Sequence, residues 1–543
     1  MVFGLPEGKA EWTKFLWNEG PALLFFVTWL CANIGLFFST YSSYQTNEDY
    51  KCPHDIMGAG LSVARGAAMI LNLNCALILL PVCRNLLSLV RGSIRLSFIR
   101  LLDHNITMHK LIAWTICLAA VVHTGAHFFN FLNLEKTGSL QCGGQPGTSA
   151  EDYAFATIAG STGHIVVLVM FLMFTSSMSI IRRSYFEIFW YTHHLFVVFF
   201  VLLCIHGLGG LVKKRVVIDP TDPANDVYES QPPNFWKFVV GPFGVYLIER
   251  GLRFYRYTQN TIVQKVVQHP SKVVEIQLVR RGFHSKPGQY IFVHCPAVSW
   301  FEWHPFTLTS APEEDFASVH IRVAGDWTTK FAEALGCNWS NKGDAGEIQA
   351  SATLPRVAFD GPFGTASEDV FKYEVAVCVG TGIGVTPFAS ILKSIWYRLL
   401  NPSIQLKLRK VYFIWVCREK EAFEWFADLL EALEQQMEQQ NLYDFLDARI
   451  YLTGELNSNE VRNVMLNDEE EADAITGLRA KTNFGRPQWG RIYEQLVQDH
   501  PSTNIGVFYC GPKVVAKELG RLSKQFTNPR PGGTIFNFNK ENF

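Results

Sequence analysis

Long apolar stretches crowd the first half of this chain of 543 residues and stop near residue 250. Each approaches the roughly 20 apolar residues that an α-helix needs to cross a bilayer. They lie near Pro21–Thr40, Met57–Cys83, Ile106–Leu132, Tyr153–Ser176, Glu187–Gly209 and Phe235–Ile248, the last of which is short. We therefore predict six transmembrane helices. The first span is expected to remain as an anchor, because no signal-peptide pattern precedes it.

Charged residues between these spans predict which loops face the cytosol. Arginines gather between the second and third spans, between the fourth and fifth, and after the sixth: Arg84, Arg91, Arg95, Arg100, Arg182, Arg183, Arg250, Arg253 and Arg256. The other loops are acidic or mixed, although Lys213, Lys214 and Arg215 weaken the contrast in the last of them. By the positive-inside rule, and by the even number of spans, both termini are predicted to be cytosolic.

Histidines within two of the spans are expected to carry chemistry. The third span holds His109, His123 and His127, and the fifth holds His193, His194 and His206. A histidine at bilayer depth is costly without a partner, so it marks a functional site. His109 and His123 are about 21 Å apart along a helix with ~40° of rotation between them, which fits two planar macrocycles stacked between two helices. The alternative is that each histidine hydrogen-bonds a neighbouring helix.

The fifth span fits this arrangement less simply. His193 and His206 are about 19.5 Å apart along a helix, but their rotational match is poor, and that of His194 with His206 is no better. Spacing leaves His193 and His194 open, and the helix would need a local distortion or a ligand near its end. Imidazoles on both faces make haem iron six-coordinate, which suits electron transfer. Oxygen would then be reduced one electron at a time, which favours superoxide.

From Tyr257 onward the sequence is typical of a globular α/β protein. Short β-like runs at Val263–Val267 and Val273–Val279, and a turn and strand at Lys286–Val293, predict a small antiparallel barrel. Polar strand segments follow at His304–Ser310 and at His320–Arg322, and the alternative interpretation of these is a solvated barrel face. The net charge of −1 gives no indication of a nucleic-acid partner.

The last region alternates strand and helix. A glycine-rich turn, Gly380-Thr-Gly-Ile-Gly-Val-Thr-Pro387, joins the apolar strand Glu374–Val379 to a helix-like segment, Phe388–Leu400. Glycines at such a junction let backbone amides approach a pyrophosphate at a helix N-terminus. The turn is not a Walker A loop, because no Lys-Ser/Thr pair follows. It predicts dinucleotide binding.

Basic residues near the ends of the next strands indicate which dinucleotide binds. Arg418 follows the strand Lys410–Val416, and Arg486 lies in a later turn. Arginine suits a 2′-phosphate, so NADPH is favoured over NADH, and a surface arginine without a ligand is the alternative. Cys510 ends the strand Ile505–Tyr509 and is expected in the ligand crevice. The twelve cysteines contain no Cys-x-x-Cys pair, which disfavours cysteine-based zinc and iron–sulfur sites.

Longer motifs resemble the catalytic subunit of the NADPH oxidases, most closely the phagocyte-type subgroup. The matching segments are Leu80–Leu87, Arg182–Glu187, Trp190–His194, Glu302–Phe316, Asp360–Val370 and Asn539–Phe543. The resemblance covers nearly the whole chain. It implies electron transfer from cytosolic NADPH through FAD and two b-type haems to oxygen, with superoxide formed on the far side of the membrane.

The same resemblance implies the fold and the domain boundaries. An α-helical bundle of six transmembrane helices, of the ferric-reductase type, would hold both haems in residues 1–256. A ferredoxin-reductase-like module would follow, with an antiparallel β-barrel FAD domain in residues 257–367 and a Rossmann-like α/β NADPH domain in residues 368–543.

In the membrane half, the resemblance implies axial ligands for both haems, which are His109 and His193 for the inner haem and His123 and His206 for the outer haem. It thereby selects His193 over His194 as the ligand in the fifth span. Arg65 and His127 would line an oxygen site beside the outer haem, where a cation stabilises a developing superoxide anion. Phe199 would lie between the haems, and lipid or core packing is the alternative for that residue.

In the cytosolic half, the resemblance implies a residue set for each nucleotide. The flavin would be bound by His304, Pro305, Phe306, Thr307, Arg322, Trp327 and Thr328, with Arg322 at the diphosphate. The NADPH phosphates would be bound by Gly380, Gly382, Gly384, Thr386 and Pro387, with Arg418 and Arg486 as further contacts. Cys510 would lie near the nicotinamide, and the terminal Phe543 near the flavin.

The resemblance also implies partners, which are a small membrane subunit, cytosolic activator proteins and a Rac-type GTPase. It implies a multi-pass location in the plasma membrane or in a phagosome or endosome membrane. The chain departs from the subgroup in its outward loops at 132–154 and 210–234, which are short and lack glycosylation acceptors. Cys52 and Cys142 lie in predicted outward loops and could pair. No EF-hand loop precedes the first span, which disfavours a calcium-gated enzyme.

Two other functions are compatible with this organisation. A ferric-chelate reductase shares the architecture and differs in its acceptor, and Arg65 and His127 favour oxygen. A proton channel with a cytosolic sensor would need no haem, and its current would persist without NADPH.

Overall fold

The computed structural model describes residues 9–93, 104–137, 147–218, 226–339, 345–348, 354–401, 405–419, 423–442, 444–454 and 481–541, with residues 473, 475, 476 and 478. The chain divides into two compact units. The helical unit comprises Ala22–Leu86 and His104–Arg250, and the α/β unit comprises Met1–Pro21, Leu87–Asp103 and Gly251–Phe543.

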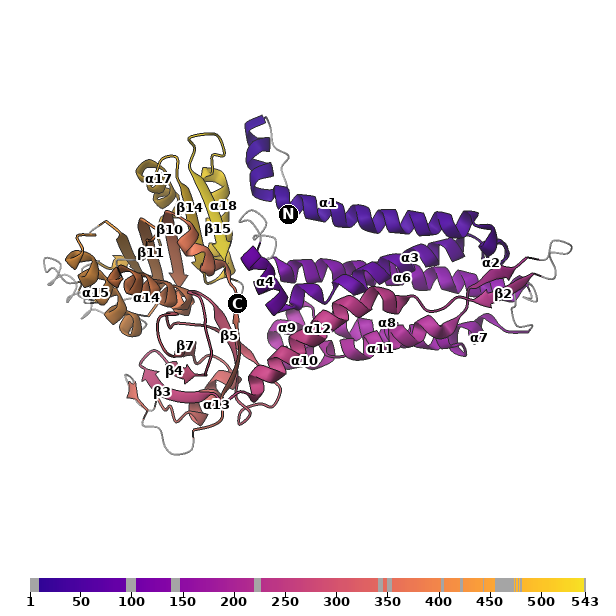
Figure 1. The fold of residues 1–543 in the computed structure, drawn as a ribbon, viewed down its shortest axis with the longest axis horizontal. Coiled ribbons are helices and arrows are strands. Elements are labelled where there is room, and N and C mark those ends of the chain that lie inside the picture. Colours follow the sequence, from indigo (N-terminus) through magenta and orange to yellow (C-terminus); the bar gives the residue numbers. More distant parts are fainter. Residues whose placement is uncertain are drawn as a thin grey trace. The chain divides into compact units, whose positions relative to one another are not determined.

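The helical unit consists of long helices that run alongside one another (Figure 1). The long helices are α1 (Lys9–Thr46), α3 (Ala59–Leu77), α6 (Asn105–Thr137), α8 (Ile158–Ser176), α10 (Phe186–His193), α11 (Phe196–His206) and α12 (Phe235–Thr258). Short elements connect them: α2 (Lys51–Met57), α7 (Ala150–Phe155), α9 (Ser179–Ser184) and a hairpin of β1 (Lys213–Val217) and β2 (Val227–Ser230). Helix α3 packs along α6, and α8 packs against α10 and α11.

Five helical stretches among the described residues are long and apolar enough to cross a membrane. They are Trp12–Thr46, Ala59–Val82, Asn105–Thr137, Ile158–Ser176 and Phe186–Gly209, and they coincide with the first five predicted spans. The sixth predicted span lies in α12, which is not among the five, because Lys237, Glu249 and Arg250 interrupt its apolar sequence. Many apolar side chains on the long helices are exposed, as expected where lipid is the solvent.

A small polar network fixes α1 against α3. The indole Nε1 of Trp29 donates to Asn74 Oδ1 at 3.2 Å, and Asn74 Nδ2 donates to Asn33 Oδ1 at 2.6 Å. All three side chains are buried. Polar groups in an apolar surrounding are stable only when each finds a partner, so these bonds select one register between the two helices.

The α/β unit begins with an antiparallel barrel made of two sheets. One sheet has the strand order β7-β4-β3-β8, and the other has the order β6-β5-β9. The bounds are β3 (Ile262–His269), β4 (Val273–Val279), β5 (Tyr290–His294), β6 (His304–Thr307), β7 (Ala317–Arg322), β8 (Gly346–Glu347) and β9 (Ala358–Phe363), with helix α13 (Asp326–Ala334). Alternating residues such as Val274, Ile276 and Leu278 fill the barrel core, as expected for a strand with one face turned inward.

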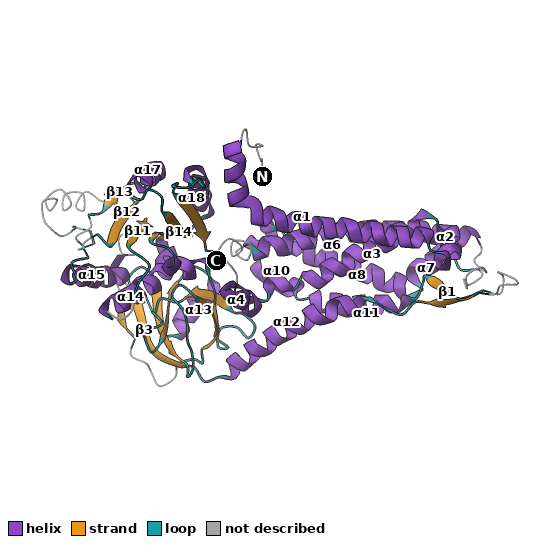
Figure 2. Cartoon of the chain, turned by 45° about the horizontal axis from the view of Figure 1, so that its top comes forward, coloured by secondary structure: helices purple, strands orange, loops and turns teal. Residues whose placement is uncertain are grey.

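A six-stranded parallel sheet follows, with the order β13-β12-β11-β10-β14-β15. Its strands are β10 (Val375–Thr381), β11 (Lys410–Cys417), β12 (Leu446–Leu452), β13 (Asn483–Phe484), β14 (Asn504–Cys510) and β15 (Ile535–Lys540). The helices between them are α14 (Thr386–Leu400), α15 (Glu424–Gln439), α17 (Trp489–Asp499) and α18 (Lys513–Phe526). Figure 2 shows strands of this sheet, and the helices that connect them, in a second orientation. Apolar clusters cover both faces, as a parallel sheet requires.

The strand order changes direction next to β10, which pairs with both β11 and β14. Ligands of open α/β sheets bind at such a switch point, outside the carboxyl ends of the strands. The glycine-rich turn lies at this position, where it forms a short 3-10 helix, Gly382–Val385, before α14.

Three arginines form ion pairs with buried carboxylates in the α/β unit. In the sequence, these arginines serve only to predict which loops face the cytosol. Arg91, in helix α4 (Arg84–Ser93), donates to Asp369 Oδ2 at 2.8 Å, and both side chains are at most 7% exposed. Beside this pair, Ser88 Oγ accepts a hydrogen bond from the Gly364 amide at 3.0 Å. The carboxylate of Asp360 accepts a hydrogen bond from Arg253 and another from Arg256, each at 2.8 Å. Within the α/β unit, these contacts join Ser88 and Arg91 to the segment after β9, and Arg253 and Arg256 to β9.

Replacing Arg91 by alanine is expected to lower the free energy of unfolding by about 3 kcal/mol, because Asp369 would remain as a buried charge. The loss falls at the lower end of the range for such pairs, since Lys372 also contacts Asp369, at 2.6 Å. Thermal unfolding of the full chain in detergent measures this change. The control is Lys517→Ala, an exposed position in α18. Equal midpoints for the two variants would show that the buried pair does not stabilise the unit.

Candidate functional site

The fifth span is not one continuous helix, and this break positions two of its histidines. Helix α10 ends at His193, and α11 begins at Phe196 and ends at His206. The ring of His193 faces that of His109 with 6.1 Å between centroids, and the ring of His206 faces that of His123 with 6.3 Å. The sequence leaves open a local distortion or a ligand near the helix end, and this span has both, because the helix breaks after His193 and His206 is the last residue of α11.

A hydrogen bond fixes the Nδ1 atom of each of these four imidazoles. His109 donates to the Ile78 carbonyl and His123 to the Ala64 carbonyl, both at 2.9 Å. On the other side, His193 Nδ1 bonds Ser177 Oγ at 3.1 Å, and His206 Nδ1 bonds Thr162 Oγ1 at 3.2 Å. With Nδ1 occupied, Nε2 is the nitrogen left for a metal ion, which is how proteins orient a histidine ligand.

The separation of the facing rings fits one iron ion between each pair. A metal–imidazole bond is about 2 Å long, and the ring centre lies about 1 Å behind the nitrogen, so two axial imidazoles have centres roughly 6 Å apart. Both pairs have that separation. His194 is exposed and bonds the Trp190 carbonyl through Nδ1 at 2.7 Å. His193 is therefore the residue that faces His109.

A cavity of about 610 Å³ adjoins the second of these pairs. It is lined by Arg65, His123, His127, Phe199 and His206, among others. The Nε of Arg65 is buried with no hydrogen-bond partner among the described residues, and its guanidinium lies 5.1 Å from the centre of the Tyr44 ring. His127 lies 4.6 Å from His123, ring centre to ring centre. The cavity thus has a fixed positive charge and the size of a cofactor or small-ligand site.

A second cavity, of about 500 Å³, lies at the switch point of the parallel sheet. Five predicted residues line it together: Arg322, Gly382, Gly384, Arg418 and Cys510. At Gly384, an added Cβ would lie 2.4 Å from the carbonyl oxygen of Cys510, so the turn can approach β14 only with glycine at this position. The remaining members of the turn, Gly380, Thr386 and Pro387, lie on β10 and at the start of α14 and do not line the cavity.

Cys510 contributes a buried thiol to this cavity. It is 8% exposed, and burial raises the pKa of the thiol well above its usual range. The group therefore stays protonated at neutral pH and can pack against a neutral ring without adding charge.

The flavin-segment residues form a separate group on the barrel. The ring of His304 stacks on Trp327 at 4.2 Å between centres, and its Nε2 bonds Glu302 Oε2 at 2.9 Å. Trp327 Nε1 is buried and has no partner in the described part of the chain, so it is available to a ligand. Pro305 is exposed on β6, and Phe306 packs at 6.1 Å from Trp327.

Two predicted flavin residues have roles within the protein. The hydroxyl of Thr328 accepts the amides of Ala324 and Gly325 at 3.1 and 3.0 Å and thereby caps α13. Thr307 is buried at the end of β6. The structure does not bring Arg486 to the nucleotide cavity: it is exposed and does not line it. Phe543 lies outside the described residues.

Sequence reasoning missed several residues that shape this region. Glu541 lines the nucleotide cavity and accepts the Ser367 amide at 2.7 Å. Glu313 and Glu314 contact α14, where Ser394 donates to Glu313 at 2.9 Å and Lys393 pairs with Glu314 at 3.4 Å. All three glutamates lie in motifs that the sequence singles out, but their partners lie about eighty residues away or more, so no local pattern identifies these contacts.

The disulfide prediction is tested in part. Cys52 is disulfide-bonded. Cys142 lies outside the described residues, so the pairing of these two cysteines stays a prediction.

Comparison with known proteins assigns the three regions to known families. Residues 65–204 match the family described as "Ferric reductase like transmembrane component", residues 258–367 match "FAD-binding domain", and residues 373–524 match "Ferric reductase NAD binding domain".

Full-length relatives are similar over nearly the whole chain. The chain is 43% identical to "NADPH oxidase 1" of Mus musculus, over 98% of this chain and 95% of the relative. It is also 43% identical to "NADPH oxidase 3" of Homo sapiens, over 97% of this chain and 99% of that protein. The same identity, over 98% and 99%, relates it to a "Superoxide-generating NADPH oxidase heavy chain" of Dictyostelium discoideum.

Gly384→Ala is expected to raise KM for the dinucleotide at least tenfold, since the turn must move away from Cys510 to accommodate the methyl group. Steady-state kinetics measure the change, and flavin content confirms that the barrel is folded. Gly490→Ala is the matched control, because an added Cβ there meets nothing within 4 Å. An unchanged KM in the Gly384 variant would contradict the role given to this turn.

Proposed function

The chain belongs to the NADPH oxidases, and from that premise we propose which of its residues perform each part of the reaction. It is a membrane oxidoreductase that transfers electrons from NADPH through FAD and two b-type haems to molecular oxygen, giving superoxide. When bound, FAD and the haems divide a two-electron hydride into single electrons and pass them on. Everything else in the reaction depends on how this chain binds and orients those groups.

We propose that His109 and His193 ligate one haem, and that His123 and His206 ligate the other. The observation that carries this proposal is the pair of ring separations, 6.1 and 6.3 Å, with every Nδ1 already hydrogen-bonded. Held between two imidazoles, a bound haem would suit electron transfer rather than oxygen binding, which agrees with superoxide as the product.

Arg65 and His127 are proposed to form the oxygen site in the cavity beside His123 and His206. The Arg65 guanidinium is a permanent cation, and a superoxide anion that forms beside it is stabilised electrostatically. The buried Nε of Arg65 has no partner among the described residues, so it is available to the anion. Stabilisation of the superoxide product by this cation favours oxygen over a ferric chelate as acceptor. Phe199, which is 6% exposed in the same wall, is proposed to separate the two haem sites.

At the nucleotide cavity, we propose that backbone groups of Gly382 and Gly384 hold the NADPH pyrophosphate at the start of α14. Arg418, which is exposed at the cavity edge, is proposed to contact the 2′-phosphate. The neutral Cys510 thiol would pack against the nicotinamide. On the barrel, the stacked His304 and Trp327 are proposed to border the flavin, with the free Trp327 Nε1 as a donor.

The remaining proposals concern topology and partners. We propose that α12 completes a sixth crossing, which leaves both termini in the cytosol. A plasma membrane or a phagosome or endosome membrane is the proposed location. A small membrane subunit, cytosolic activators and a Rac-type GTPase are the proposed partners, supported by the resemblance of the chain to the phagocyte-type subgroup.

The inner ligand pair can be tested with two adjacent histidines. His193→Leu is expected to remove about half of the bound haem, because its partner His109 alone cannot hold a six-coordinate iron. His194→Leu is the matched control and should retain both haems, since that side chain is exposed. Haem content per flavin, from pyridine haemochrome spectra, measures both. Loss of haem in the His194 variant, with retention in the His193 variant, would reverse the assignment.

The acceptor can be tested in one membrane preparation. His123→Leu is expected to abolish superoxide formation while NADPH still reduces the flavin. The substitution removes only a ligand of the outer haem, which is the last carrier before oxygen. Superoxide output and reduction of a ferric chelate are compared before and after the substitution. Wild-type superoxide output from His123→Leu would refute the outer-haem assignment. Ferric reduction that exceeds superoxide formation in the unmodified chain would favour a ferric-chelate reductase.

A further inference from the structure

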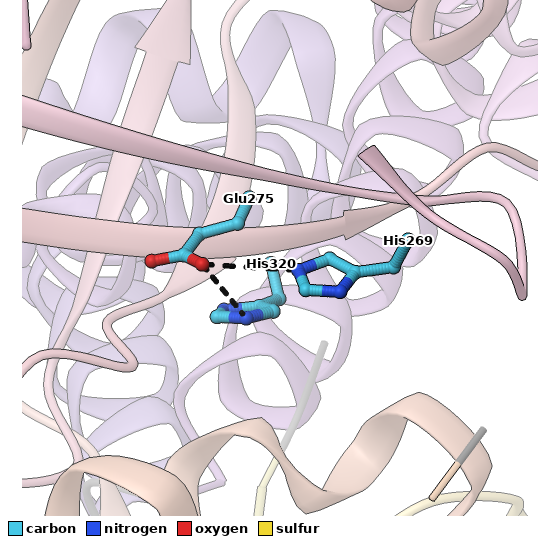
Figure 3. A group of neighbouring side chains, drawn as sticks. All are labelled: His269, Glu275 and His320. Atoms are coloured by element: carbon cyan, nitrogen blue, oxygen red, sulfur yellow. Dashed lines mark ion pairs between the residues drawn. The ribbon is translucent and has the colours of Figure 1, made fainter. Parts of the chain in front are cut away.

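Three ionisable side chains converge on the outer surface of the barrel (Figure 3). They are His269 at the end of β3, Glu275 on β4 and His320 on β7. Glu275 and His320 are direct partners across the β4–β7 ladder. Glu275 Oε2 lies 3.7 Å from Nε2 of His269 and 3.7 Å from Nε2 of His320. One ligand atom of each residue lies within 4.8 Å of the others.

The three side chains are held in this arrangement by a second set of contacts. His269 Nδ1 bonds Glu424 Oε2 at 3.2 Å, and His320 Nδ1 bonds Thr309 Oγ1 at 2.8 Å. The other oxygen of the Glu275 carboxylate accepts from Gln277 Nε2 at 2.9 Å. Each imidazole thus presents Nε2 to the same carboxylate oxygen, and a carboxylate or hydroxyl orients it from behind, which is the arrangement of histidine ligands in metal sites.

The space between these atoms is too wide for hydrogen bonds. Both Nε2 atoms form ion pairs with Glu275 at 3.7 Å, drawn as dashed lines in Figure 3, but at that distance neither makes a hydrogen bond to the carboxylate. His269 is 7% exposed and His320 is 8% exposed, and the Nε2 of His269 has no hydrogen-bond partner in the described part of the chain. A buried nitrogen that makes no hydrogen bond is costly, so this atom calls for a closer ligand.

Zinc fits both the spacing and the donor types. Zinc binds imidazole nitrogen and carboxylate oxygen at about 2.0–2.2 Å, so two of its ligand atoms can lie 3.7 Å apart. Two histidines and one glutamate are a common zinc ligand set, with a fourth position left for water. The cysteine-based zinc motifs that the sequence lacks are not required here.

We propose that His269, Glu275 and His320 bind a zinc ion on the outer face of the barrel, where α15 covers it, separate from the haem, flavin and nucleotide sites. Its ligands are His269 Nε2, His320 Nε2 and Glu275 Oε2, and water completes the coordination. Glu424 and Thr309 orient the two imidazoles.

The position of this site suggests what the ion does. Glu424 begins α15 of the parallel-sheet domain, and the next residue, Trp425, stacks on His320 at 4.2 Å between ring centres. The ion therefore lies where α15 contacts the barrel. Val273 and Arg322 pair across the β4–β7 ladder and both line the nucleotide cavity. A bound ion would fix the barrel and α15 at the wall of that cavity.

The test uses the full-length protein in detergent. It is stripped with a chelator, titrated with zinc chloride and analysed for metal by mass spectrometry after removal of free ion. The expected result is about one zinc per flavin in the unmodified chain. At least a tenfold lower affinity is expected in His320→Asn and in Glu275→Gln. His284→Asn is the matched control, because His284 is a barrel histidine outside the cluster.

Each outcome supports or overturns the site. Cobalt substituted for zinc should give the visible absorption of a nitrogen- and oxygen-ligated ion in the unmodified chain and not in Glu275→Gln. Less than about 0.1 zinc per flavin in the unmodified chain would overturn the proposal without recourse to any variant. Zinc binding that the two cluster variants leave unchanged would also overturn it. If iron or manganese binds in preference, the zinc assignment is wrong. Superoxide formation enters none of these measurements.

Discussion

The separation of two pairs of imidazoles is the constraint on which the helical unit depends. Each pair must hold its ring centres roughly 6 Å apart, and the helices behind them meet this demand with matched spacing. Ala64 in α3 and Ile78 at its end accept from His123 and His109 on α6, so acceptors and histidines are both fourteen residues apart on antiparallel neighbours. Thr162 and Ser177, in α8 and at its end, orient the opposite pair. The five helices α3, α6, α8, α10 and α11 therefore form two repeated layers, and a shift of α3 against α6, or of α8 against α10 and α11, would disturb both layers.

Much of this arrangement can be predicted from the histidine spacing alone, but the choice between His193 and His194 cannot. The rise between His109 and His123 predicts two layers, and the structure has two facing pairs. The choice between His193 and His194 depends on the break between α10 and α11, which turns His193 inward and leaves His194 exposed. No proline or glycine marks that break in the sequence. At the level of sequence, therefore, only the family resemblance selects His193.

The ion-pair partners of charged residues are likewise not predictable from the sequence. Arg91, Arg253 and Arg256 are evident as cationic positions in the sequence, and a loop count treats them as equivalent to solvated arginines. In the structure Arg91 pairs with Asp369, which is 278 residues away in the sequence. Arg253 and Arg256 pair with Asp360, about a hundred residues away. A hydropathy pattern reports composition along the chain and carries no information on such distant partners. These arginines therefore serve as ion-pair partners within the α/β unit, whatever they contribute to topology.

Burial by a neighbouring domain also explains why the polar barrel strands are not a solvated face. His320 lies on β7 in a polar segment that resembles an exposed strand, and yet it is 8% exposed, because α15 covers it. Polar groups buried in this way need partners from the element that covers them, and Glu424 and Trp425 supply two. An apolar contact between the barrel and α15 would tolerate sliding, whereas a polar one requires each donor to meet its acceptor. The polar contact thus fixes α15 against the barrel in the place where both border the nucleotide cavity. A single orientation of the two domains is what hydride transfer between bound nucleotides requires.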